Sequence, residues 1–239
     1  MNLKRVIRQS GFVWLALFGT GALAAGAGTV THLSGTLSVQ RSDGGVRILS
    51  QKSEVNPGDV LTTQRDSYAQ INFSDGSSLT MRPNTQIKIE QYHFVQDRPQ
   101  EDNTFLRLVK GGLRTVTGLV GKRGNQDAYK IGTNTATIGI RGSSGDTIDS
   151  SMGGCEGVTP ECDKLPPGVY HATYTGSYIM QNEGGSRIIV EGQFGFAGDF
   201  KTLPVILPGD PGLNATQLPF MLGVSSGRIL GPGQECVVR

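Results

Sequence analysis

The stretches FLRLVKGGLRTVTGLVGK at residues 105–122, YKIGT at 129–133 and ATIGIRGS at 136–143 decide the fold class of this chain. Apolar residues recur at every second position in much of each stretch, which is the period of a β-strand with one buried face. Lys110-Gly111-Gly112 predicts a tight turn, and the polar run 123–127 predicts a loop. This part of the chain is therefore expected to form a series of short strands.

The same period continues towards the N-terminus. Residues 33–39 and 68–73 alternate, and the second run stops at Asp75-Gly76, a turn-forming pair. Residues 79–82 alternate next, with Arg82 on the polar side. No window carries a persistent apolar stripe at helical spacing, so the prediction is an all-β fold with little helix outside the N-terminal segment.

Composition excludes several classes of protein. The chain has 239 residues, 35 of them glycine, and a formal net charge of +2. Glycine is about twice as frequent as usual but lacks the three-residue period of collagen, so many turns are the better explanation. A nucleic-acid partner is not expected, because phosphate recognition requires clustered Lys and Arg.

Residues 1–27 have the three-part plan of a secretory signal peptide. Basic residues are followed by an apolar run of about a dozen residues, too short for the roughly 20 of a membrane span. Cleavage is expected after Ala24 or Ala27; an uncleaved membrane anchor is the alternative. Removing 1–27 takes away three basic residues and no acidic ones, so the charge becomes −1. We predict a periplasmic or secreted protein whose membrane contact ends with cleavage.

Export would place the three cysteines in an oxidising compartment. Cys155 and Cys162 enclose a polar, turn-forming hexapeptide, so a local disulfide between them is predicted, although other pairings remain open. Cys236 would then be left over, either free or joined to a partner. No metal site is predicted, because the histidines and cysteines lack the spacing of zinc ligands.

Four strings carry a resemblance to a known family: DGSSLTMRPNTQIKIEQYHF at 75–94, LVKGGLRTVTGLVGK at 108–122, YKIGTNTATIGIRGS at 129–143 and GSYIMQNEGGSRIIVEGQFGF at 176–196. They resemble the FecR domain, named for periplasmic regulators of iron-siderophore uptake, over about residues 35–196. The resemblance implies an all-β stack of short strands, solenoid-like or roll-like.

The predicted organisation has three parts. The signal peptide 1–27 precedes a FecR-like β domain at 28–200, in which 145–168 form an insertion that carries the disulfide loop. A Pro/Gly-rich tail at 201–239 is expected to cap the open end of the stack or to dock into another subunit. About ten residues precede the apolar run, too few for the family regulators' cytoplasmic anti-sigma segment, so sigma-factor sequestration is not expected.

No pattern in the chain forms a convincing catalytic or cofactor site. Gly118–Lys122 is similar to a phosphate loop but lacks the required flanking residues, and Gly139, Gly142 and Gly145 lack the spacing of a dinucleotide fingerprint. Asp146 and Asp149 could pair as carboxylates, but solvated loop residues are the simpler interpretation. The prediction is no enzyme and no cofactor.

Three residues are candidates for recognition: Arg114, Arg141 and Tyr174. Each arginine lies among apolar strand residues, where an ionised group needs a partner or solvent. One interpretation is structural, with each guanidinium exposed or paired with a carboxylate such as Asp59, Asp75 or Asp146. The other is a surface that binds an anionic envelope ligand.

The predicted function is a non-catalytic protein-binding or scaffolding module of the bacterial cell envelope, with signalling as one option. It would bind an envelope protein partner through an exposed sheet edge or face. The alternative is a module that binds cell-wall or surface glycans, for which possible stacking rings are Tyr68, Tyr92, Tyr170, Tyr174 and Tyr178.

Overall fold

The computed structural model describes residues 26–152, 157–158 and 164–213. This part of the chain is all-β, as predicted, with fifteen strands, one 3-10 turn η1 (Pro99–Glu101) and no α-helix. Within it, no helix is long and apolar enough to cross a membrane. The predicted signal peptide up to residue 25, both cysteines of the predicted disulfide and Cys236 lie outside the described residues.

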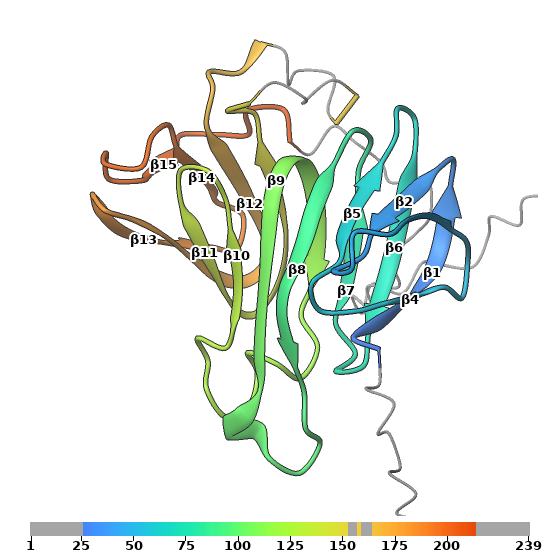
Figure 1. The fold of residues 1–239 in the computed structure, drawn as a ribbon. Coiled ribbons are helices and arrows are strands. Elements are labelled where there is room, and N and C mark those ends of the chain that lie inside the picture. The colour runs from blue at the N-terminus through green and yellow to red at the C-terminus, as the bar shows by residue number, and fades with distance from the viewer. Residues whose placement is uncertain (1–25, 153–156, 159–163, 214–239) are drawn as a thin grey trace, which may run out of the picture.

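The strands form one hydrogen-bonded sheet that folds into two layers (Figure 1). The first layer contains β3 (Val46–Leu49), β2 (Leu37–Gln40), β5 (Val60–Thr63), β8 (Gln86–His93), β9 (Asn103–Val116), β10 (Tyr129–Gly132), β11 (Thr137–Asp149), β12 (Val169–Asn182) and β13 (Gly185–Val190), in that order. The second contains β4 (Glu54–Val55), β1 (Gly28–Ser34), β6 (Tyr68–Phe73), β7 (Ser78–Met81), β9, β11, β12, β14 (Phe194–Ala197) and β15 (Val205–Leu207). Strands β9, β11 and β12 therefore belong to both layers.

Each of the three shared strands bends at a glycine with positive φ. Gly111 in β9 has φ 88°, Gly142 in β11 has φ 64° and Gly176 in β12 has φ 72°. The predicted turn at Lys110–Gly112 is wrong, because β9 does not fold back on itself there. Its first half pairs with β8 and its second half with β7. A left-handed residue redirects the strand from one layer to the other.

Short strands change layers in the same way. A residue with positive φ lies in each of these connections: Gly35, Lys52, Gly58, Asp66, Asn84 and Gly192. The glycine excess in the sequence is thus partly explained by the repeated passage of the chain between the two layers.

A continuous apolar core lies between the layers. It contains residues of the first layer such as Leu61 and Ile138 together with residues of the second such as Ile71 and Leu113, all fully buried. The alternation that predicted the strands thus also identified the side chains that fill this core.

A second apolar cluster lies on the outer face of the second layer. There Ile148, Tyr170 and Ala172 are covered by Val158 and Leu213. The predicted insertion 145–168 begins inside a strand, because β11 continues to Asp149. The first part of the predicted tail adds β15 beside β14, at one edge of this layer.

Candidate functional site

The most highly charged place in the interior is a cluster around Asp146. The carboxylate of Asp146 and the guanidinium of Arg82 are ion-paired, and neither side chain has any exposed surface. Arg114 donates from Nε to Oδ1 at 2.6 Å and from Nη2 to Oδ2 at 2.9 Å. Arg82 directly follows β7, while Arg114 and Asp146 are paired across β9 and β11, so the register of these strands brings the three residues together.

Tyr174 completes this cluster from β12. Its hydroxyl donates to Oδ2 of Asp146 at 2.8 Å and accepts from Nη2 of Arg114 at 3.2 Å, and its ring centre lies 4.7 Å from the Arg114 guanidinium carbon. Burial alone would raise the pKa of Asp146, but the charges of Arg82 and Arg114 outweigh it and lower that pKa. Burial, with Asp146 nearby, raises the pKa of Tyr174.

Both carboxylate oxygens of Asp146 are engaged within the cluster, by Arg82, Arg114 and Tyr174. Asp149, the other candidate carboxylate, accepts hydrogen bonds from Asn134 and Ser151. His171 points into the core, where it bonds to the Thr147 hydroxyl at 3.0 Å and burial lowers its pKa to about 3. The two aspartates and the histidine therefore do not face one cleft. Among the described residues, no group of His, Cys, Asp and Glu could hold a metal ion.

Of the carboxylates considered as partners for Arg114, Asp146 is the one that binds it. Arg141, in contrast, pairs with Asp127 at 3.0 Å, with both side chains partly exposed. The three recognition candidates thus fall into two places: Arg114 and Tyr174 in the buried cluster, and Arg141 at a surface groove.

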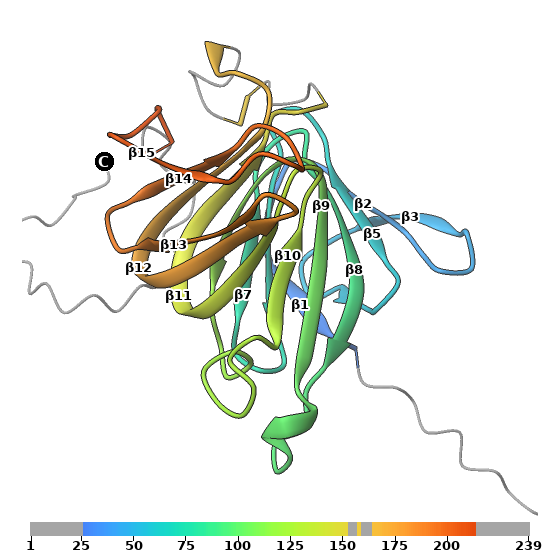
Figure 2. The same ribbon diagram turned by 90° about the vertical axis from the view of Figure 1, so that its left-hand side faces the viewer.

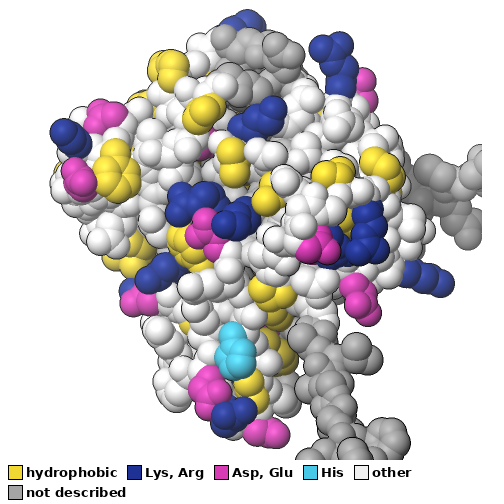
Figure 3. All heavy atoms as spheres, viewed as in Figure 1, with side chains coloured by type: hydrophobic (Ala, Val, Ile, Leu, Met, Phe, Trp, Pro, Cys, Tyr) yellow, Lys and Arg dark blue, Asp and Glu magenta, His cyan; other side chains and the backbone are white. Residues whose placement is uncertain are grey.

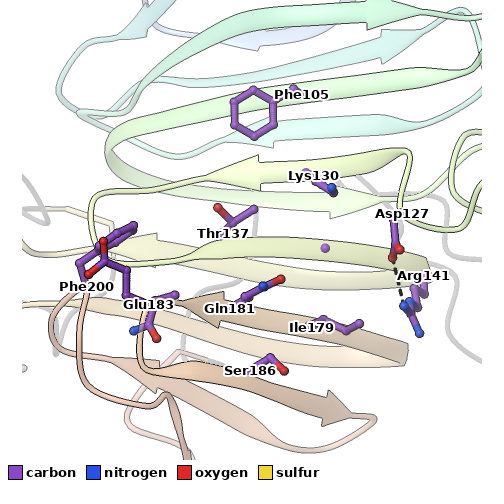
Figure 4. A pocket seen from close by; sticks show the side chains of 12 residues that line it. Phe105, Asp127, Lys130, Thr137, Arg141, Ile179, Gln181, Glu183, Ser186 and Phe200 are labelled. Carbon is purple, nitrogen blue, oxygen red and sulfur yellow. Dashed lines mark hydrogen bonds and ion pairs between the residues drawn. The ribbon is translucent and has the colours of Figure 1, made fainter.

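That groove lies on the outer face of the first layer and encloses about 650 Å³. The ion pair of Arg141 and Asp127 closes one end, and Phe200 stands at the other (Figure 4). Its floor crosses β10, β11 and β12 and carries Thr137, Gly139 and Ile179. Sequence reasoning did not identify this groove, because its residues become neighbours only through the register of five strands.

Several of the tyrosines predicted as sugar-stacking rings are buried or packed against other residues of the fold. Tyr178 is fully buried and Tyr170 is 3% exposed. Tyr92 contacts Asp75 through its hydroxyl and stacks on Phe73 at 5.2 Å. The tyrosines thus give little support to the glycan prediction.

A second surface feature is the edge strand β3, which is hydrogen-bonded to β2 alone among the described strands. Val46 and Ile48 are 70% and 69% exposed there. Arg47 between them is also exposed and makes no ion pair with any described residue. Figure 2 shows β3 at the far side of the molecule from β13 and β15.

Residues 59–157 match the model of the FecR protein family. The chain contains a FecR domain. The matched range covers Arg82, Arg114 and Asp146 of the buried cluster and Lys130, Gly139 and Arg141 of the groove. Tyr174 and strands β12 to β15 lie beyond it, although β12 is hydrogen-bonded to β11 of the FecR domain.

The chain aligns in part with two crystal structures of a "putative anti-sigma factor" from Parabacteroides distasonis. Both align with a TM-score of 0.46, at 10% and 9% identity, over 64% of this chain. The alignment spans 60% of that protein. A comparison with curated protein sequences gives no match.

Proposed function

We propose that this chain is an exported, non-catalytic protein-binding module of the bacterial cell envelope that uses its FecR domain as a rigid scaffold. The partner adds an extended strand to the free edge of β3. The observation that carries the proposal is the exposure of Val46 and Ile48 on this edge, at 70% and 69%. Exposed apolar side chains on an unpaired strand are the features that strand addition uses.

The other sheet edges are less suited to this role. Strand β4 has two residues and β15 has three. Strand β13 lies against the segment that leads to β15, because Arg187 donates to the carbonyl of Pro204. Strand β3 therefore offers the most accessible edge among the described strands.

The side chains of β3 indicate the chemistry of the partner. Val46 and Ile48 lie on one face, opposite Gln40 and Ser38 of β2, and Arg47 points to the other. If two copies of β3 paired to bring these apolar residues together, Arg47 of one copy would oppose Arg47 of the other, which is unfavourable. An extended segment with an acidic residue between two apolar ones fits better, because its carboxylate would lie beside Arg47.

The charge distribution agrees with a protein partner rather than a polyanion. On the face in Figure 3, acidic and basic side chains are interspersed and form no single patch of one sign. The buried arginines Arg82 and Arg114 are neutralised in part by Asp146 and are not available to a large anionic surface.

Site-specific cross-linking in cells tests the proposal. A photoreactive amino acid replaces Ile48 in the exported protein, and the matched control carries it at Ile206, an isoleucine on edge strand β15 with 44% exposure. We expect an adduct at position 48 that maps to an apolar–acidic–apolar segment of another protein, and its loss in R47E. The proposal is wrong if position 48 gives no adduct, if both positions capture the same proteins, or if the adduct is a second copy of this chain.

A further inference from the structure

The groove on the outer face of the first layer has the order of a built site. Register places one residue from each of four strands in a row across it: Phe105, Lys130, Gly139 and Ile179. In the next row along the strands, Thr137, Gln181 and Ser186 line the groove. Gly132 and Arg107 continue this row, and the Arg107 guanidinium is paired with Glu90. A mainly apolar row therefore lies beside a row of hydroxyl and amide groups (Figure 4).

Both aromatic walls of the groove are held in place by the protein itself. A Cβ atom on Gly132 would lie 2.9 Å from Cζ of Phe105, so this ring packs directly on the glycine. The guanidinium of Arg107 lies 5.6 Å from the centre of the same ring.

At the other wall, Phe200 belongs to a turn organised by Asp199. The Asp199 carboxylate accepts from the amides of Lys201 and Thr202 at 2.7 Å each, and the Phe200 carbonyl accepts from the Glu183 amide at 3.0 Å. The backbone that carries Phe200 is thus held in place, and the Phe200 side chain is 47% exposed, which leaves its ring accessible to a ligand.

The middle of the groove is open because β11 has a glycine there. A Cβ atom on Gly139 would contact nothing closer than Ile179 at 3.9 Å, and Gly139 has no positive φ. Neither backbone strain nor close packing requires glycine at this position. Its consequence is free space between Lys130 and Ile179.

The nature of the floor argues against a peptide as the occupant. Strands β10, β11 and β12 have hydrogen-bonded neighbours on both sides, so a peptide lying on them could not pair with their main chains. A ligand must use side chains. Sugar rings present C–H faces and hydroxyl edges side by side, which matches an apolar row beside Thr137, Gln181 and Ser186.

The charges define the ligand further. Arg141 is bound to Asp127, while Lys130 has no ion-pair partner among the described residues. Lys130 is therefore the cation available to a bound anion in the middle of the groove. We propose that the groove binds an oligosaccharide, with a carboxylate-bearing sugar beside Lys130. This site is separate from the β3 edge and does not depend on strand addition there.

Calorimetric titration of the exported protein tests this proposal. The probes are a galacturonate tetramer, its neutral methyl ester, soluble peptidoglycan strands and a tetraglutamate peptide. We expect binding of at least one acidic glycan, a loss of at least tenfold in G139F, and a similar loss in K130Q for the acidic glycan but not for the methyl ester. The matched control K88Q, on β8 of the same layer, should bind like the unaltered protein.

The outcomes separate the alternatives. The proposal is overturned if none of the glycans binds, if G139F binds them as well as the unaltered protein does, or if tetraglutamate binds in the groove and competes with the glycans. Thermal unfolding of G139F checks that the fold is retained, which the open space around Gly139 predicts. A failure here would leave the cross-link at Ile48 unaffected, since the two sites are far apart in the strand order.

Discussion

Replacing Asp146 by Asn should strongly destabilise the fold. The carboxylate accepts from Arg82, from two nitrogens of Arg114 and from the Tyr174 hydroxyl, and the Asp146 side chain is fully buried. An amide offers one acceptor oxygen and turns two hydrogens towards these donors. The change removes the negative charge of Asp146 from beside the buried guanidinium of Arg82. Breaking a buried pair in this way costs about 3 to 5 kcal/mol.

Urea unfolding followed by circular dichroism measures this cost. With a slope of about 2 kcal/mol per M, the midpoint of D146N should fall by about 2 M. The matched control is R141Q, which removes a partly exposed ion pair with Asp127 and should cost less than about 1 kcal/mol. A triple variant, R82M/D146L/R114M, should recover much of the loss, because the two buried arginine charges are removed together with the Asp146 carboxylate. If D146N and R141Q unfold at the same urea concentration, the cluster does not stabilise the fold as argued.

Three further predictions concern other parts of the chain. Burial lowers the pKa of His171 to about 3, so the unfolded chain binds the proton first, and stability should fall by about 1.4 kcal/mol per pH unit as the pH drops from 6.5. Unfolding at pH 7 and pH 5 should show this loss in the unaltered protein and not in H171F. Gly111 and Gly76 both have positive φ. A Cβ atom on Gly111 would lie 2.7 Å from Cα of Thr85, whereas one on Gly76 would meet nothing within 4 Å. G111A should therefore cost clearly more than the roughly 1 to 2 kcal/mol of G76A, and equal melting temperatures would contradict this. If Cys155 and Cys162 form the predicted disulfide, thiol titration of the unfolded, exported protein should find one free thiol before reduction and three after it.

The strands could be predicted from the sequence because each buries one face and therefore alternates. The bend at Gly111 could not, because the need for a left-handed residue is the same in a hairpin turn and in a strand that changes layers. Only the pairing of β9 with β8 and then with β7 distinguishes the two.

The charged residues show a similar limit. The sequence leaves three carboxylates open as partners for Arg114, and Asp146 is the one that binds it. The rule that a guanidinium among apolar residues needs a partner holds here. Alternation predicts Arg82 on the polar face of the segment 79–82, yet Arg82 is fully buried. Val158 lies over that face, and the Arg82 guanidinium donates to its carbonyl. Val158 is distant in sequence, so the pattern of residues in the strand does not reveal this cover. Alternation identifies two faces and cannot show that both are covered.

The passage of β9, β11 and β12 through both layers has a mechanical consequence. In a sandwich joined by loops alone, one sheet can slide over the other without stretching a strand. Here β11 carries Gly139 and Arg141 in the groove and, a few residues further along the same backbone, Asp146 in the buried cluster. A displacement of β11 along its axis at the groove would pull Asp146 against Arg82 and Arg114. The groove and the cluster are thus connected by one continuous strand that bends at Gly142.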